Sequence, residues 1–87
     1  MGFKKLSGVP LSEEKQGMIR YTCLTYESQP PRVQRKIQRL CLRCAGAYSA
    51  ALFDVMCTKR SITAIAMEYF VSEEQLYRFR RAFYMAW

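Results

Sequence analysis

The sequence predicts an all-α domain, because its apolar residues recur at the spacing of helices and nowhere alternate with polar residues as they do in strands. Serine, proline and glycine residues divide these apolar patterns into separate stretches, as they commonly do where helices begin and end. We expect a small helical domain of about five helices, the last two of which are joined by a tight turn.

The composition sets the size and class of the protein. Its 87 residues are 51% apolar and 14% aromatic, which is too rich in core-forming side chains for a disordered chain and fits one compact domain. Residues 1–11 contain two glycines, a proline and two lysines with little periodicity, so we expect a flexible N-terminal arm there. The helical domain is then expected over residues 12–87.

The first helix is expected over residues 13–27. Ser12 has the side chain of an N-cap, and Glu13 and Glu14 lie in the first turn, where the helix dipole favours negative charge. The apolar residues of this helix fit a helical period only loosely; they are Met18, Ile19, Cys23 and Leu24.

Two prolines, Pro30 and Pro31, end that helix and open a second one over residues 32–44. Its apolar stripe consists of Val33, Ile37, Leu40, Cys41 and Cys44. Beside it runs a stripe of cations with no acid among them, Arg32, Lys36, Arg39 and Arg43. Such a stripe is either a solvated face or a contact surface for phosphate. Gly46 separates this helix from a third over residues 47–57, which carries a single charge and should be the most buried.

The last two helices have clear boundaries. Ser61 is expected to cap a helix over residues 62–69, and Ser72-Glu73-Glu74-Gln75 is a capping-box pattern that begins another helix at residue 73. The apolar seam of this last helix consists of Leu76, Phe79 and Phe83. Its other faces are expected to carry Tyr77, Arg78, Arg80, Arg81 and Tyr84.

Residues 61–84 resemble the DNA-binding helix-turn-helix families, especially the C-terminal promoter-reading domain of sigma factors and the small regulators of phages and mobile elements. The residues that carry the likeness are Ile65 and Ala66 where the helices cross, Tyr69 at the end of the first, Val71 and Ser72 in the turn, and Leu76 and Phe79 on the inner face. One position departs from the pattern. These families usually have glycine in the turn, whereas this chain has Phe70, a bulky residue that does not readily take a positive φ.

The resemblance implies that the helix from Glu73 lies in the major groove of DNA. The residues expected to read bases are Ser72, Glu73, Tyr77, Arg78 and Arg81. Arginine suits guanine O6 and N7, and Glu73 can accept a hydrogen bond from cytosine N4. Glu73 and Glu74 also oppose the phosphates, so compensation of the helix dipole is the alternative role for both. The residues expected to contact phosphates are Arg32, Lys36, Arg39, Arg43, Lys59, Arg60 and Arg80.

Several kinds of chemistry are disfavoured. The chain has no histidine, so it lacks a Ser-His or Cys-His nucleophile and any nitrogen ligand for zinc. It also lacks a Gly-rich phosphate loop, and we therefore expect no enzyme, no cofactor and no small-molecule substrate. Cys41 and Cys44 have the spacing of a zinc knuckle, but they fall inside a continuous helix, so we expect free thiols and no metal.

The longest uncharged run, residues 44–53, is far shorter than the roughly 18 apolar residues of a spanning helix. The N-terminus also lacks the pattern of a secretory signal or a myristoylation site. We expect a cytoplasmic protein with no membrane partner.

The net charge of +7 attracts polyanions at long range. Together with the resemblance, it makes sequence-specific binding of double-stranded DNA by a small bacterial or phage transcriptional regulator the leading hypothesis. The alternative is a helical module that binds a protein and no nucleic acid, and a third hypothesis is binding of RNA or single strands by stacking. We also expect a homodimer, because residues 83–87 are strongly aromatic and one helix-turn-helix reads only a few base pairs.

Overall fold

The computed structural model describes residues 8–87, and over this range the chain is all-α, without a strand. The α-helices are α1 (Glu13–Leu24), α2 (Pro31–Ala45), α3 (Ser49–Cys57), α4 (Ile62–Tyr69) and α5 (Glu73–Ala86). Two short 3-10 turns, η1 (Tyr26–Ser28) and η2 (Gly46–Tyr48), precede α2 and α3. The all-α prediction is therefore confirmed.

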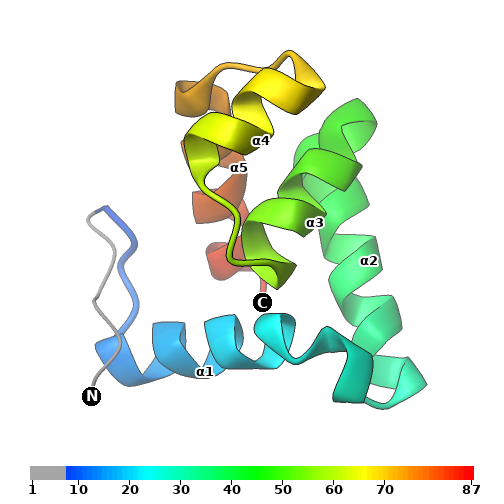
Figure 1. Cartoon of the computed structure of the whole chain (residues 1–87). Coiled ribbons are helices and arrows are strands. Elements are labelled where there is room, and N and C mark those ends of the chain that lie inside the picture. Colours follow the sequence, from blue (N-terminus) through cyan, green and yellow to red (C-terminus); the bar gives the residue numbers. More distant parts are fainter. Residues whose placement is uncertain (1–7) are drawn as a thin grey trace.

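The helices surround α3, which packs against α1, α2, α4 and α5. In Figure 1, α2 and α3 run side by side, α1 crosses one end of the domain, α4 lies at the opposite end, and α5 returns toward α1. Four of the nine residues of α3 are buried, namely Ala51, Leu52, Val55 and Met56. This central position agrees with the prediction that the third helix is strongly buried, since its single charge leaves most of its surface free to join the core.

Serine side chains begin three of the helices, as the sequence predicts. The oxygen Oγ of Ser12 accepts from the Lys15 amide at 3.1 Å, and Ser61 and Ser72 cap α4 and α5 in the same way. Each bond satisfies a backbone donor that has no partner within the helix. As predicted, α4 begins at Ile62 and ends at Tyr69, and α5 begins at Glu73.

The first helix differs from its prediction. It ends at Leu24 rather than at residue 27, and Met18, expected on its apolar face, is 48% exposed. The buried residue is instead Gln16, whose side-chain nitrogen donates to the carbonyls of Val9 and Leu11 at 3.3 and 3.1 Å. A polar residue is stable there because these bonds satisfy its amide group.

The same bonds correct the prediction of a flexible arm over residues 1–11. Val9 is buried and Leu11 packs against the core, so residues 8–11 belong to the folded domain. Residues 1–7 lie outside the described part of the chain.

The end of α5 is also more buried than predicted. Tyr84, expected on an outer face, is only 2% exposed, and Phe83 is fully buried. Trp87 is half-buried, and the Lys36 ammonium lies 4.1 Å from the centre of its ring. These aromatic residues complete the core of their own domain, so they do not form the exposed aromatic surface from which a homodimer was expected.

Arg20 of α1 binds the end of α3. Its Nη1 donates to the carbonyls of Val55 and Met56, the latter at 2.8 Å, and Nη2 donates to the carbonyl of Thr58 at 3.0 Å. The last carbonyls of a helix lack hydrogen-bond partners within the helix and carry a partial negative charge. A guanidinium supplies both the hydrogen-bond donors and the positive charge that they require. The apolar pattern of α1 gave no sign of this contact.

Phe70 ends α4 in the left-handed conformation, with φ 54° and ψ 45°. The amides of Phe70 and Val71 both donate to the carbonyl of Ala66, the latter at 3.1 Å, which closes the helix as glycine commonly does. The side chain of Phe70 is 91% exposed. The turn therefore adopts a conformation that is unfavourable for a residue with a bulky side chain.

Within the described residues, the stretch Pro31–Cys57 is long and apolar enough, by length and composition alone, to cross a membrane. Core helices of soluble proteins share these two properties. In the fold the stretch is divided at Gly46, which has a φ of 53°, and its two halves pack against each other as α2 and α3.

Replacement of Arg20 by lysine should destabilise the fold. Lysine keeps the charge but lacks the planar fork that reaches several carbonyls, so the Arg20→Lys variant should lose about 1.5–3 kcal/mol of unfolding free energy in urea titrations. The exposed Arg78→Lys change is the matched control and should alter stability by less than about 0.5 kcal/mol. Equal stability of the two variants would contradict a structural role for Arg20.

Replacement of Phe70 by glycine should stabilise the fold. A left-handed conformation costs a non-glycine residue about 1–2 kcal/mol, and the greater freedom of glycine in the unfolded chain offsets part of this gain. We expect Phe70→Gly to be more stable than the parent by up to about 1 kcal/mol in urea titrations. Phe70→Ala keeps the strained backbone and should show no gain; an alanine variant as stable as the glycine variant would contradict the strain.

Candidate nucleic-acid interface

The junction between α4 and α5 is held at several points. Val71 is buried behind the turn, and Ser72 Oγ accepts from the Gln75 amide at 3.0 Å. Thr63 Oγ1 in α4 donates to Glu73 Oε2 in α5 at 3.2 Å. The direction of α5 relative to α4 is thus fixed by core packing together with polar contacts.

Three of the residues predicted to read bases lie on the exposed side of α5. Tyr77, Arg78 and Arg81 are exposed, whereas Leu76 and Phe83 are buried on the opposite side. A shallow depression of about 300 Å³ lies among these exposed residues, and its lining consists of Val9, Glu74, Tyr77, Arg78, Arg80 and Arg81. Three arginines and one acid make this part of the surface basic.

The arginines of the depression differ in their contacts. Arg81 Nε donates to the Gly8 carbonyl at 2.6 Å, which attaches the segment before α1 to α5. The Arg80 guanidinium lies 5.0 Å from the centre of the Tyr77 ring, and burial lowers the pKa of Arg80. Arg78 pairs with Glu74 at 3.4 Å, and both side chains are largely exposed. An exposed pair of this kind is weak, so Arg78 is the arginine of α5 most easily released to a ligand.

The other two predicted base-reading residues, Ser72 and Glu73, take part in the junction. Ser72 caps α5, and Glu73 lies in its first turn while it accepts from Thr63. Both side chains are exposed at the start of α5. The contacts favour the dipole-compensating role that the sequence left open for Glu73.

The cations of α2 lie mostly on its outer side. Arg32, Arg39 and Arg43 are exposed, and the half-buried Lys36 lies over the ring of Trp87. Among the described residues, none of these four cations forms an ion pair with an acid. Because Lys36 touches the last residue of the chain, the α2 cations adjoin the C-terminal end of α5.

Arg60, predicted to contact phosphate, is engaged within the domain. Its guanidinium pairs with Asp54 at 3.0 Å and with Glu68, and Tyr69 donates to the same Asp54 carboxylate at 2.8 Å. This network joins α3 to α4. Both Lys59 and Arg60 are exposed, but Arg60 is paired with two carboxylates, whereas Lys59 forms no ion pair within the described residues.

The four cysteines are not joined in disulfides. Over residues 8–87, no group of three or more cysteine or carboxylate side chains comes together in a way that could hold a metal ion. Burial, aided by the neighbouring Cys57 and Cys44 thiols, raises the pKa of Cys41 from 9.0 to about 12. Burial also raises the pKa of Cys44. These thiols are held in their protonated form, which is the less reactive one.

No protein-family model, curated protein or solved structure matches the chain.

The raised pKa of Cys41 should make stability fall at alkaline pH. The thiol ionises near pH 9 in the unfolded chain but stays protonated in the fold, so its contribution is complete below pH 9 and is lost as the pH rises toward 12. Each pH unit in that window costs about 1.4 kcal/mol. The stability advantage of the parent over Cys41→Ala should therefore shrink by about 1–2 kcal/mol between pH 8 and pH 10.5 in urea titrations. An advantage that is the same at both pH values would contradict the shift.

Proposed function

We propose that the protein binds double-stranded DNA sequence-specifically through a helix-turn-helix formed by α4 and α5, as a small bacterial or phage transcriptional regulator. The observation that carries the proposal is the α4–α5 junction. An eight-residue helix, a left-handed residue at Phe70, a buried Val71 and a capped start of α5 follow one another in the order of the helix-turn-helix pattern.

The dimensions of α5 suit the major groove. Its 14 residues span about 21 Å, and a helix with its side chains fits a groove about 12 Å wide. Arg78 lies in the middle of the exposed side, flanked by Tyr77 and Arg81. In the complex, Arg78 leaves Glu74 and donates to guanine O6 and N7, which replaces a weak exposed ion pair by two directed hydrogen bonds.

The remaining cations position the domain on the phosphates. Within residues 8–87 the four α2 cations form no ion pair with an acid, and Lys36 brings this stripe next to the end of α5. The half-buried Arg80 of α5 and the exposed Lys59 after α3 complete the set of cations proposed to contact phosphates. Arg60 is the weakest member of the predicted set, because a phosphate would have to compete with Asp54 and Glu68 for its guanidinium.

The proposal is tested by selection of binding sites from a pool of random duplexes, followed by fluorescence anisotropy on the selected site at several salt concentrations. We expect a defined recovered sequence and an affinity that falls steeply with salt, because bound cations displace counterions from the phosphates. Recovery of no common sequence, or no duplex binding even at low ionic strength, would overturn the proposal.

The variant Arg78→Ala should bind the selected site about 10–100-fold more weakly, since one bidentate base contact is worth about 1–3 kcal/mol. Its preference should relax at one base pair, measured by anisotropy on sites changed singly at each position. Lys15→Ala is the matched control, because it removes the same charge from an exposed position of α1. Equal losses in both variants would assign the effect to net charge and refute base reading by Arg78.

A further inference from the structure

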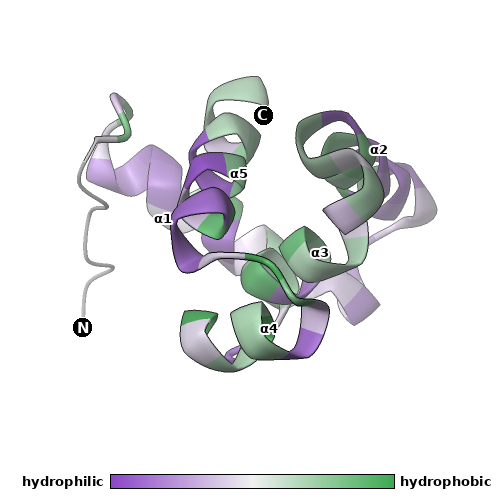
Figure 2. Cartoon of the chain, turned by 90° about the horizontal axis from the view of Figure 1, so that it is seen from above, coloured by the Kyte–Doolittle hydropathy of each residue, from purple (hydrophilic) through white to green (hydrophobic). Residues whose placement is uncertain are grey.

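The outer side of α4 and the turn after it carry exposed apolar residues beside the polar Thr63 and Glu68. Ala64, Met67 and Phe70 are exposed, Met67 by 74% and Phe70 by 91%. Figure 2 shows α4 at the edge of the domain as a largely hydrophobic ribbon. No lysine or arginine occurs between Ile62 and Tyr77, so this face is poorly suited to phosphate.

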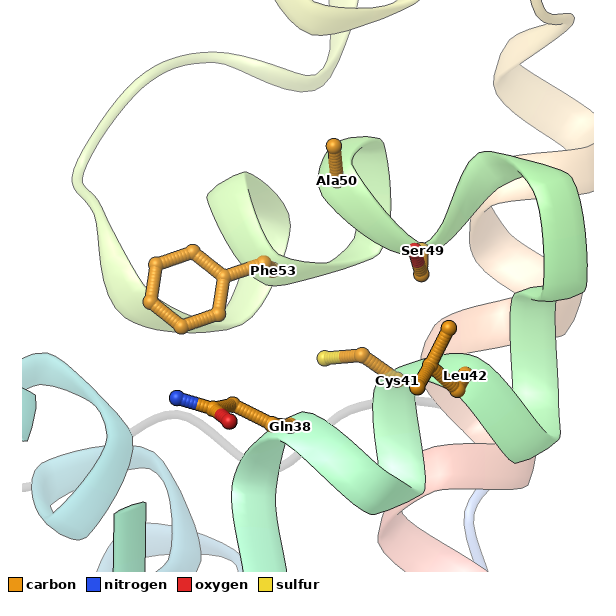
Figure 3. A pocket seen from close by; sticks show the side chains of 6 residues that line it. All are labelled: Gln38, Cys41, Leu42, Ser49, Ala50 and Phe53. Carbon is orange, nitrogen blue, oxygen red and sulfur yellow. The ribbon is translucent and has the colours of Figure 1, made fainter. Parts of the chain in front are cut away.

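A groove between α2 and α3 is the second unpartnered apolar feature. It has a volume of about 240 Å³ and is lined by Gln38, Cys41, Leu42, Ser49, Ala50 and Phe53. Figure 3 shows side chains from both helices bordering it, with the ring of Phe53 at one end. A cavity of about 150 Å³ lined by apolar side chains accepts benzene, so the groove has room for one phenyl ring.

The two features carry opposite charge. The segment 60–78, which includes the α4 face, contains three glutamates and two arginines; Arg60 and Arg78 pair with Glu68 and Glu74, and Glu73 forms no ion pair among the described residues. The segment 31–50, which borders the groove, contains five bases and no acid. On α2, Arg35 and Arg39 are exposed and stand three positions before Gln38 and Leu42 of the groove, respectively, hence on the same side of the helix.

We propose that copies of this protein associate head to tail, with Phe70 of one copy seated in the α2–α3 groove of the next. Met67 then covers the rim of the groove, and Glu73 faces Arg35 and Arg39 of the other copy. This contact gives a function to the exposed ring of Phe70, which occupies a left-handed turn position where glycine would be favoured.

The arrangement has a definite geometry and strength. The ring and the groove are different surfaces, so each copy offers one of each and the contact does not close on itself as a two-fold dimer does. One inserted ring with its rim covers much less than the roughly 1,200 Å² of a stable interface. The association is therefore weak and open-ended, and it increases steadily with concentration.

Two variants test the Phe70 ring and the α2–α3 groove one at a time. Phe70→Gly removes the ring and suits the backbone of the turn, and Ala50→Trp fills the groove from an exposed position of α3. The matched controls are Tyr21→Ala, which removes another exposed aromatic ring, and Ala47→Trp, which adds indole outside the groove. Circular dichroism establishes that each variant is folded before its mass is measured.

Light scattering and sedimentation velocity of DNA-free protein, up to about 1 mM, give the decisive result. We expect the average mass of the parent to rise with concentration and both single variants to stay monomeric. Their equimolar mixture should form a dimer and nothing larger, because only Phe70 of the groove-filled variant and the open groove of the glycine variant can pair. Both controls should associate as the parent does.

A parent that stays monomeric, a Phe70→Gly variant that associates like the parent, or a mixture that does not dimerise would each overturn the proposal. A two-fold dimer that persists in both variants would assign self-association to another surface and refute this one. The measurements contain no DNA, so their outcome is independent of the proposed DNA binding.

Discussion

The contact between Arg20 and the last carbonyls of α3 underlies the arrangement of the other helices. Helix α3 packs against every other α-helix of the described chain, so its position fixes the centre of the core. The carbonyls of Val55, Met56 and Thr58 lie where α3 ends and the chain turns toward α4. By binding them, Arg20 fixes α1 to that turn, and the course of the chain into α4 follows from it.

A group of polar side chains between α3 and α4 then fixes the position of α4. Asp54 accepts from Arg60 and Tyr69, and Arg60 also pairs with Glu68. A network in which one guanidinium joins two carboxylates orders fewer side chains per contact than separate pairs do, so it constrains α4 at a lower entropic cost. The turn at Phe70 then sets the direction of α5, whose outer surface is the candidate interface.

Much of the fold could be predicted from the sequence, because many of its determinants are local. Capping serines act on amides three residues away, and apolar residues at helical spacing define the buried side of α2, α3 and α5. The exposed positions of Tyr77, Arg78 and Arg81 follow from the same periodicity, once Leu76 and Phe83 define the buried side. The left-handed turn at Phe70 does not follow from the residue at that position, because a bulky side chain disfavours this conformation.

The features that could not be predicted depend on residues far apart in the chain. Arg20 binds carbonyls 35 to 38 residues away, and Arg81 binds one 73 residues away. Gln16 is buried in place of Met18 because carbonyls of the preceding segment turn back onto α1. The burial of Tyr84 likewise depends on how α5 packs, which local periodicity does not specify.

The bond between Arg81 and the Gly8 carbonyl has a practical consequence for handling the protein. It places the start of the described chain beside the exposed surface of α5. An affinity tag or fluorescent fusion joined directly to Gly8 therefore emerges next to that surface, where its bulk and charge can shield the arginines. Attachment after Trp87 places the label instead beside Lys36 and the end of α2. Comparison of the two attachment points distinguishes shielding by the label from a property of the domain itself.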